Sequence, residues 1–544
     1  MQALLRLADL NSLKAGDTAG MDVWLERDQV WSRDSLAPYL ESLLAGRPLV
    51  IVSNREPWIH SLSPESSDTV LVERPASGLV SALEPLAEAT GGTWIALGHG
   101  SADRLVVDGS DAVAMPPASP RYRLRRLWLN QGQIDGYYRQ VSNRGLWPMC
   151  HLAYVAPRFE PRHWQTYRQV NAMFARSILE ETPEDGAVVF VQDYHLALVP
   201  RLIKLARPSL TVVQFWHIPW PAAEQVRSCP YADELINGLL GNDLLGFQTD
   251  EHCQNFVDTL EQLRTLSLAS DGEPRLESWP PDEAADNRPA RHRTRIGSFP
   301  ISIDFEAWNA AAGLPEVNTA IKAWRQALDL DGQRLGIGID RLDYTKGLLQ
   351  RLDGLDHLFE LHPEWLGQLL FLQVLAPSRQ GIETYDQLRI DIERRVQEIN
   401  DRWRQDQWQP LQLQHQQHQP AQIHALHQLA DFCVVSSLDD GMNLVAKEFV
   451  ASRCDSDGVL ILSRYTGSAK ELPDALQVNP YARHEIAQAI HEALTMNESI
   501  RRYRMARMRE QVRTHNIYRW SAELLGHVAQ RQPIDPAVIP IAGG

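Results

Sequence analysis

The chain has 544 residues, of which 44% are hydrophobic and 22% charged, and its formal net charge is −16. This length predicts more than one domain, and the composition is typical of a soluble globular protein. The acidic balance argues against non-specific nucleic-acid binding, which needs a basic field.

The cysteines and the N-terminus predict a cytoplasmic protein. None of the 5 cysteines belongs to a CxxC pair, so we expect reduced thiols in the core or at the surface. No apolar run reaches the roughly 18 residues of a membrane span. The first residues carry acidic side chains and no small-residue cleavage site, unlike a signal peptide. We therefore expect no membrane association.

Short apolar runs alternate with helical patterns through the first half of the chain. Residues 1–47 are expected to form a polar, helical extension whose helix runs from Asp34 to Leu44. Residues 101–120 are expected to be irregular, and residues 268–294 to be an exposed insertion. Strands are predicted at residues 48–53, 93–97, 187–192, 211–216 and 244–248. Apolar strands that alternate with helices predict a parallel, doubly wound sheet.

A second α/β set follows a predicted linker strand at residues 299–304. Further strands are predicted at residues 335–340, 368–374, 432–436 and 458–463, and helices at residues 381–404 and 499–531. The expected fold is therefore α/β, with two doubly wound Rossmann-like domains, residues 48–304 and 305–505, that face each other across a cleft. Residues 506–544 are expected to provide a C-terminal helix that packs back on the first domain, and a tail.

A strand-to-helix turn in the second half offers an anion site. Asp440-Gly441 ends the strand at residues 432–436, and Asn443 begins the next helix. Free backbone N–H groups and the positive end of the helix dipole attract phosphate, whereas the carboxylates of Asp440 and Glu448 suit sugar hydroxyls. The turn thus suits a nucleotide sugar. An ordinary α/β turn with a solvated acidic pair is equally compatible with the sequence.

Cations follow two strands of the second half. Arg341 can bind a diphosphate bidentately and Lys346 as a point charge, which suits a leaving group whose charge grows in the transition state. A solvated loop end is the alternative. Arg379 could bind an anion at the mouth of the cleft. The chain has no GxxxxGK[ST] loop, so we do not expect a P-loop NTPase.

The first half places polar side chains at the carboxyl ends of its strands, where open α/β sheets bind ligands. Arg55 follows the first strand, Asp193 follows the strand at residues 187–192, and His217 begins a loop with two prolines. Tyr138 and Trp147 are interpreted either as a wall that contacts a sugar or as a peripheral aromatic cluster.

A histidine-rich tract raises the question of a metal site. His415, His418, His424 and His427 lie close together in the sequence, but no carboxylate or cysteine partner lies at ligand spacing. We therefore expect no metal and no cofactor.

Seven motifs, in this order along the chain, resemble a known family. It is the family of retaining glucosyltransferases that make trehalose 6-phosphate from a nucleotide-glucose and glucose 6-phosphate, and the resemblance covers about residues 48–525. The motifs are Ser53-Asn54-Arg55, Tyr138 with Trp147-Pro148, Asp193-Tyr194-His195, His217-Ile218-Pro219, Arg341 to Gly347, Ser378-Arg379 and Asp440 to Glu448. Agreement in both type and order makes the resemblance specific.

The resemblance implies a GT-B type fold with the active site in the cleft and no metal requirement. The donor, UDP-glucose as we expect, would be bound by Gly78, His217, Arg341, Lys346, Asp440, Gly441, Met442, Asn443, Leu444, Val445 and Glu448. The acceptor glucose 6-phosphate would be bound by Arg55, Tyr138, Trp147, Asp193, Tyr194 and Arg379. Catalysis would rest on His217, Asp440, Arg341 and Lys346. The acceptor hydroxyl would attack from the face that the diphosphate leaves.

Three departures from the family pattern leave the substrates open. Residues 95–99 lack a tryptophan that is usual on the acceptor side, and Asp340 and Asp439 replace residues that are usual on the donor side. UDP, GDP or ADP could be the nucleotide. One alternative is glucosylglycerol-phosphate synthase, which uses ADP-glucose and glycerol 3-phosphate. The others are a catalytically silent regulatory homologue and a pyridoxal-phosphate phosphorylase of similar fold.

The resemblance also implies partners and a setting. Trehalose synthesis in an osmoprotective or stress response would take place in the cytoplasm. A homo-oligomer and a trehalose-phosphate phosphatase that acts downstream are compatible with the resemblance. Neither nucleic acid nor a membrane is an expected partner.

Overall fold

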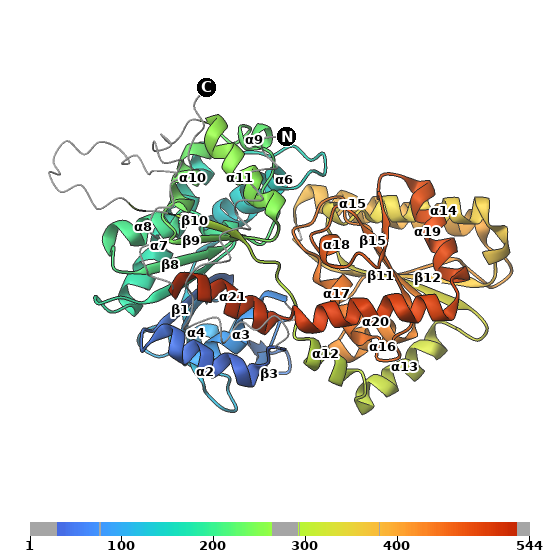
Figure 1. Cartoon of the computed structure of the whole chain (residues 1–544), viewed down its shortest axis with the longest axis horizontal. Helices are drawn as coiled ribbons and strands as arrows, with labels where there is room; N and C mark the ends of the chain where they lie inside the picture. Colours follow the sequence, from blue (N-terminus) through green and yellow to red (C-terminus); the bar gives the residue numbers. More distant parts are fainter. Residues whose placement is uncertain (1–29, 76–77, 264–291, 293, 380, 530–544) are drawn as a thin grey trace, which may run out of the picture.

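Two sheets, one in each half of the chain, organise the fold into two lobes (Figure 1). The computed structural model describes residues 30–75, 78–263, 292, 294–379 and 381–529. The first sheet has the order β10-β9-β8-β7-β1-β4-β6-β5 and the second the order β13-β12-β11-β14-β15-β16. All pairings in these sheets are parallel except that of β5 with β6. The sheets are thus doubly wound, as predicted.

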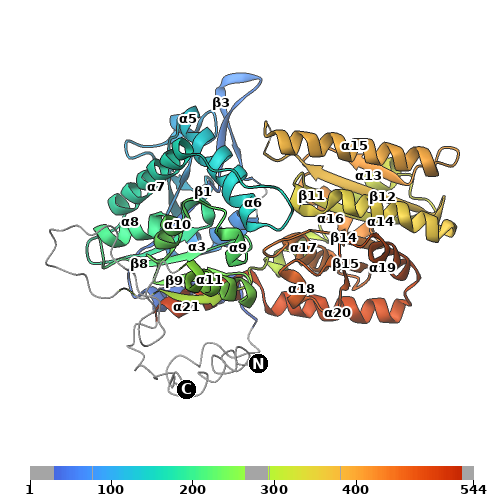
Figure 2. The ribbon, with the colours of Figure 1, turned by 90° about the horizontal axis from the view of Figure 1, so that it is seen from above.

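The strands of the first sheet are apolar because both faces of the sheet are covered. Both β7, Val188–Gln192, and β8, Thr211–Phe215, are buried along their whole length. The other strands are β1 Leu49–Arg55, β4 Thr93–Leu97, β5 Ala112–Met115, β6 Tyr122–Leu127, β9 Leu244–Phe247 and β10 Arg295–Ser298. A separate antiparallel hairpin, β2 Ile59–Ser63 with β3 Ser66–Glu73, projects from this lobe (Figure 2).

Helices cover both faces of the first sheet. One face packs against η1 Ile134–Leu146, α6 Trp147–Cys150, α7 Pro161–Glu181, α8 Val199–Ala206, α9 Ala223–Val226, α10 Ala232–Leu239 and α11 Asp250–Leu263. The other face packs against α2 Arg33–Leu44, α3 Gly78–Thr90 and α21 Ile517–Ala529. The short connecting helices are α4 Asp103–Val106, α5 Gln131–Gln133 and η2 Tyr194–Leu196.

The second lobe repeats this three-layer arrangement. Its strands are β11 Arg334–Arg341, β12 Leu369–Ala376, β13 Leu411–Gln414, β14 Phe432–Val435, β15 Val459–Ser463 and β16 Leu476–Val478. One face carries α14 Leu348–Leu361, α15 Glu383–Trp403 and α19 Arg483–Thr495. The other carries α12 Phe305–Ala311, α13 Pro315–Ala327, α16 Pro420–Leu429, α17 Leu444–Ser452 and α20 Glu498–Thr514. The short helices are η3 Tyr344–Lys346, η4 Pro363–Trp365 and α18 Ser468–Glu471.

The end of the chain crosses from the second lobe to the first. Helix α20 packs against α17, whereas α21 lies on the first sheet (Figure 1). Between the two helices, the Asn516 side chain donates a hydrogen bond to the carbonyl of Trp31 (2.7 Å). The buried Trp520 ring packs against Phe190 and Phe215, and its Nε1 donates to the Phe299 carbonyl (3.1 Å). This crossover ties the two lobes together.

Four predicted elements were wrong in detail. Residues 101–120 are not irregular, because they form α4 and the edge strand β5. The linker at residues 299–304 forms no strand, although the Phe299 N–H donates to the Phe247 carbonyl of β9 (2.7 Å), and the strand is β10, just before it. The tail predicted at residues 499–531 is two helices rather than one. Residues 196–206, whose sequence has a helical pattern throughout, begin in the 3₁₀ turn η2 and become α-helical only at α8.

The structure also bears on the expected setting. None of the helices in the described part of the chain combines the length and apolar character that a membrane crossing requires. All five cysteines are free thiols. Most of the expected insertion at residues 268–294, and residues 1–29 of the extension, lie outside the described residues.

We expect Trp520→Ala to destabilise the first lobe. Removing a buried tryptophan leaves a cavity beside Phe190 and Phe215, and such truncations lower the free energy of unfolding by about 3–5 kcal/mol. Urea unfolding followed by circular dichroism measures the change. Tyr503→Ala is the control, since the Tyr503 side chain on α20 is 62% exposed. Equal transitions in the two variants would contradict a structural role for α21.

Candidate active site

The strand orders place one crevice in each sheet, and the two crevices belong to the facing lobes. In the first sheet β1 lies between β4 and β7, and in the second β11 lies between β12 and β14. Loops that leave the carboxyl ends of such central strands diverge and leave room for a ligand. The predicted residues Arg55, Asp193 and Arg341 all lie at these strand ends. Figure 2 shows α6 of the first lobe at the boundary with the second.

Asp440 is held by three donors at the turn after β14. Lys346 Nζ lies 2.5 Å from Asp440 Oδ2, Asn443 Nδ2 lies 3.1 Å from it, and Ser437 Oγ 3.2 Å. Burial alone would raise the pKa of Asp440, but Lys346 and these hydrogen bonds hold it below its ordinary value. The carboxylate is therefore ionised and fixed in position, and the predicted pair Asp440 and Lys346 is brought into direct contact.

The start of α17 is capped in a way that leaves its first N–H groups available. Asn443 has φ 76°, and its Oδ1 accepts a hydrogen bond from the backbone N–H of Ala446 (3.1 Å). The first N–H groups of a helix have no intrahelical partner, and here they include those of the predicted residues Leu444 and Val445. This geometry is that of an anion-binding helix start.

Glu448 lies one turn into α17, and no cation or hydrogen-bond donor of the described chain balances the charge of its carboxylate. Its side chain has no hydrogen bond or ion pair within the residues that the structure describes. Burial raises its pKa to about 7. A half-buried carboxyl group of this kind is ready to accept hydrogen bonds from ligand hydroxyls.

Arg341 is an exposed cation at the end of β11, and among the described residues it has no ion-pair partner. Its charge nevertheless acts across the cleft. Together with Arg379 it counteracts the rise that burial causes in the pKa of Asp193 in the first lobe. An unpaired guanidinium between the lobes suits the binding of a phosphorylated ligand.

His217 and Asp193 lie next to each other in the first lobe, just after the carboxyl ends of β8 and β7. The backbone N–H of His217 donates to Asp193 Oδ1 (3.2 Å), and His217 Nε2 lies 2.9 Å from Gln192 Oε1. Burial lowers the pKa of His217 to about 3 and raises that of Asp193 to about 7. His217 is thus a neutral imidazole at neutral pH, so it can act on a ligand by hydrogen bonding rather than by its charge.

The predicted acceptor residues meet across the cleft. The Arg379 guanidinium of the second lobe lies 3.7 Å from the centre of the Trp147 ring of the first. It also pairs with the fully buried Asp343 (2.7 Å) and donates to the hydroxyl of Tyr385. Burial would raise the pKa of Asp343, but Arg379 holds it below its ordinary value. Sequence analysis assigned no role to Asp343, although it lies within a quoted motif.

Tyr138 lies at the meeting point of three arginines. Burial raises the pKa of its hydroxyl, but Arg55, Arg379 and Arg341 together bring it below the ordinary value, and Arg55 is hydrogen-bonded to it. Tyr194, by contrast, is 1% exposed, and its ring packs 6.0 Å from that of Trp147. Tyr194 therefore supports the wall of the pocket from behind instead of lining it.

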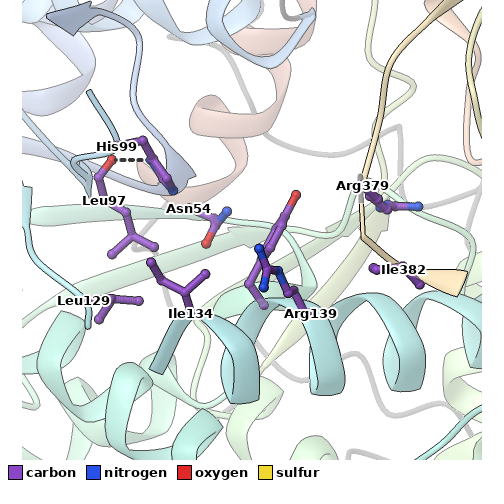
Figure 3. Close-up of a pocket in the computed structure, with 9 residues that line it drawn as sticks. Asn54, Leu97, His99, Leu129, Ile134, Arg139, Arg379 and Ile382 are labelled. Carbon is purple, nitrogen blue, oxygen red and sulfur yellow. Dashed lines mark hydrogen bonds between the residues drawn. The ribbon is translucent and has the colours of Figure 1, made fainter. Parts of the chain in front are cut away.

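A pocket of about 220 Å³ opens beside Tyr138 (Figure 3). Polar and apolar side chains from both lobes line it: Asn54, Leu97, His99, Leu129, Ile134, Tyr138, Arg139, Arg379 and Ile382. No role was predicted for Arg139, or for Asn54 within the motif Ser53-Asn54-Arg55. Each of them directly adjoins a predicted residue, Arg55 or Tyr138, and that adjacency was the available signal.

The donor turn touches the first lobe directly. A Cβ on Gly441 would collide with the His217 carbonyl oxygen and lie 3.2 Å from backbone atoms of Ile218. Met442 is buried in the core of the first lobe, and a Cβ on Gly78 would collide with Leu444. The approach at Gly441 is to backbone atoms and requires glycine, whereas at Gly78 the neighbour is the flexible end of the Leu444 side chain, so it is Gly441 that permits the lobes to close.

Asp439 takes part in the same contact. Its Oδ2 accepts a hydrogen bond from the backbone N–H of Leu152 in the first lobe (2.7 Å), and Tyr481 donates to the Leu152 carbonyl (3.1 Å). Asp340 instead lies inside the second lobe, where it pairs with the buried Arg351 (2.7 Å). Of the two unusual residues on the donor side, one thus joins the lobes and the other stabilises the second sheet.

Three residues of the candidate site have a strained backbone conformation. Nine non-glycine residues in the described chain have a positive φ, and they include Asp193 (70°), Arg379 (47°) and Asn443 (76°). Strained conformations of this kind persist where the surrounding structure imposes them, and they cluster at functional sites.

The histidines of the predicted tract do not converge. His424 and His427 are buried beside Ser452, whereas His415 lies 3.3 Å from Glu393 at the surface. Across the described residues, the group close enough to share an ion is His362, Glu364 and His491. It lies beyond the end of α14 that is remote from the cleft, the two imidazole rings are stacked, and Trp365 donates to His491 Nδ1.

Two doubly wound lobes that share one crevice, with an anion-binding helix start on one side, define a two-domain glycosyltransferase. The chain belongs to glycosyltransferase family 20, whose model matches residues 47–530. This membership confirms the predicted family and class of enzyme.

Three relatives illustrate the similarity. The chain is 34% identical over 505 residues to the trehalose-6-phosphate synthase of Mycobacterium marinum, covering 93% of this chain and 98% of the relative. It superposes with a TM-score of 0.76 and 28% identity on the UDP-forming alpha,alpha-trehalose-phosphate synthase of Burkholderia xenovorans in complex with glucose 6-phosphate, covering 88% and 99% of the two chains. An E. coli structure bound with UDP-2-fluoro glucose gives a TM-score of 0.74 and 28% identity, covering 89% and 99%.

We expect Gly441→Ala to weaken nucleotide binding without unfolding either lobe. The added methyl group would push the turn away from the His217 carbonyl, and overpacking of about 1–3 kcal/mol would weaken UDP binding about 10- to 100-fold. Titration calorimetry with UDP measures this. Gly109→Ala is the control, since nothing lies within 4 Å of a Cβ at that position. Unchanged affinity in Gly441→Ala would show that the contact is dispensable.

We expect Glu448→Gln to stabilise the protein at pH 8 but not at pH 4.5. Because the pKa of Glu448 is about 7 in the folded protein and 4.5 ordinarily, the folded state binds more protons between these values. Stability therefore falls as the pH rises through this window. Glu448→Gln has no carboxyl group to ionise, so its stability does not fall in this way. After allowance for solvent screening, its free energy of unfolding at pH 8 should exceed that of the wild type by about 1–3 kcal/mol.

Melting temperatures at the two pH values test this expectation. Glu261→Gln on α11 replaces an exposed glutamate and serves as the control. A gain that is the same at both pH values would exclude the buried carboxylate as its cause.

Proposed function

We propose that this protein transfers glucose from UDP-glucose to glucose 6-phosphate with retention of configuration, giving trehalose 6-phosphate and UDP. The observation that carries the proposal is the contact across the cleft. Lys346 and Asp440 belong to a nucleotide-sugar half-site in the second lobe. The stacking of Arg379 on Trp147 joins this half-site to an arginine-rich half-site in the first lobe. Relatives named for this reaction, one of them with glucose 6-phosphate bound, support both substrates.

The donor would be held mainly by the second lobe. Asp440 and His217 would bind hydroxyls of the glucose, and Glu448 those of the ribose. The start of α17 and the start of α3 at Gly78 would receive the diphosphate. Lys346 and the unpaired Arg341 would neutralise its growing negative charge, which is the main stabilisation available to this transition state.

The acceptor would be held by the first lobe, with Arg379 reaching across from the second. Arg55, Tyr138 and Arg379 would bind its phosphate, while Trp147 and Asp193 would shape the sugar pocket. Asp440 is tied to Lys346, and His217 has a low pKa. The donor side thus offers no nucleophile with an adjacent base, which supports attack of the acceptor hydroxyl from the face that UDP leaves, with a diphosphate oxygen taking the proton.

The setting would be the cytoplasm, because all five cysteines are free. The product is a sugar phosphate, so a phosphatase would be the next enzyme. We keep the division at residues 47, 304 and 505 as the proposed domain organisation, and a homo-oligomer remains part of the proposal.

A matrix of substrates tests the proposed reaction. The protein is incubated with UDP-, GDP- and ADP-glucose against glucose 6-phosphate and glycerol 3-phosphate, and nucleotide release is followed. We expect the highest rate with UDP-glucose and glucose 6-phosphate. A preference for ADP-glucose with glycerol 3-phosphate would replace the proposal by the sister activity, and no release in any combination would exclude the enzyme.

We expect Arg341→Ala to lower turnover about 10²- to 10³-fold, the usual loss when a stabiliser of transition-state charge is removed. The fold should persist, since Arg341 is exposed. Steady-state kinetics and circular dichroism provide the measurements. Arg334→Ala at the other end of β11 is a matched control, because Arg334 pairs with Asp431 away from the cleft. Near-normal turnover in Arg341→Ala would refute its assigned role.

A further inference from the structure

We propose that Arg139, which η1 presents to the pocket of Figure 3, is a specificity-determining residue that binds the phosphoryl group of the acceptor. The inference rests on the proposed function, because it adds a cation to the acceptor side of the same site. It assigns to Arg139 the selection of phosphorylated over unphosphorylated sugars.

The chemistry of the pocket favours an anion. Its lining contains two arginines, a histidine, a tyrosine and an asparagine, and no carboxylate. The volume of about 220 Å³ equals that of about seven water molecules at ~30 Å³ each. It can hold a phosphoryl group together with part of a sugar. Apolar side chains form the rest of the wall, so the charge of a bound anion would be only weakly screened.

Arg379 alone leaves little net charge in this pocket. Its guanidinium is paired with the fully buried Asp343 at 2.7 Å and also donates to Tyr385. A salt bridge of this kind is neutral as a unit. Arg379 can still donate hydrogen bonds, but positive charge for a dianionic phosphoryl group must come from other side chains, namely Arg55 at the end of β1 and Arg139 in the pocket lining.

Arg139 supplies such a charge. Among the residues that the structure describes, its ion pair is with Asp135 on the same helix, at 4.0 Å, where both side chains are more than 40% exposed. Exposed pairs at this separation are weakly coupled, so Arg139 is free to pair with a ligand. In Figure 3 its side chain lies on the same side of Asn54 as Arg379, which comes from the other lobe.

His99 makes the two ends of the pocket chemically different. Its Nδ1 lies 3.0 Å from the Leu97 carbonyl, which can only accept a hydrogen bond, so Nδ1 carries the proton and Nε2 is an acceptor. Its backbone N–H donates to the buried Glu56, which pairs with the buried Arg126. A fixed acceptor on the His99 side suits sugar hydroxyls, and the arginines on the opposite side suit the phosphoryl group.

The experiment compares Arg139→Gln with Arg176→Gln, which removes an exposed arginine from the neighbouring helix α7. Titration calorimetry in the presence of UDP measures binding of inorganic phosphate, glucose 6-phosphate and glucose. We expect Arg139→Gln to weaken binding of phosphate and glucose 6-phosphate about 10- to 100-fold, with glucose and UDP binding unchanged. Arg176→Gln should behave as the wild type, and Arg139→Lys should be intermediate because it keeps the charge.

Kinetics provide a second readout: with UDP-glucose as donor, Arg139→Gln should raise KM for glucose 6-phosphate more than it lowers kcat. Equal binding of phosphate by Arg139→Gln and the wild type, or no phosphate binding by either, overturns the inference. Failure of the proposed function has a different signature. The wild type would then bind phosphate in an Arg139-dependent way but release no UDP in the presence of glucose 6-phosphate.

Discussion

The close approach of Gly441 to the carbonyl of His217 is the constraint on which the site depends. Each lobe by itself carries half of a site. The turn after β14 can bring Asp440 toward the first lobe only because residue 441 has no Cβ. The same approach lets Met442 enter the core of the first lobe and lets Asp439 bond to the backbone of Leu152. Closure of the cleft therefore depends first on the shape of the backbone at Gly441, and contacts with a ligand come second.

Charges in the cleft are compensated selectively. Asp343 and Asp440 have cationic partners at 2.7 and 2.5 Å, and their pKa values are held low. Glu448 and Asp193 lie in the same region without cationic partners at such distances, and burial raises the pKa of each to about 7. The paired carboxylates are fixed in position by their cations. The uncompensated ones destabilise the folded protein when they are ionised, as carboxylates at functional sites do.

The fold and the geometry of the candidate donor turn were predictable because their signals are local. Apolar runs predicted the parallel strands, and a contiguous motif predicted the turn, the start of the next helix and both carboxylates. Residues 299–304 were misread for a physical reason. Phe299, Ile301 and Ile303 alternate as in a strand, but they are buried in the cores of two different lobes, and the pairing with β9 ends at the hydrogen bond from the Phe299 N–H to the Phe247 carbonyl. The roles of Asp343 and Arg139 depend on their positions relative to Arg379, which lies on a different segment of the chain. No spacing in the sequence predicts these relative positions.

The crossover of α21 has a consequence for synthesis of the protein. The core beneath the first sheet includes Ile517, Trp520 and Leu524 of α21. The first lobe is therefore synthesised before the second, but its core is complete only after the last helix has been made. While the ribosome synthesises the second lobe, the first lobe exposes the apolar face that α21 will later cover. Such exposed surfaces are where chaperones act and where partly made chains aggregate. The second lobe, whose strands and covering helices are nearly contiguous in sequence, can close its own core before the first lobe does.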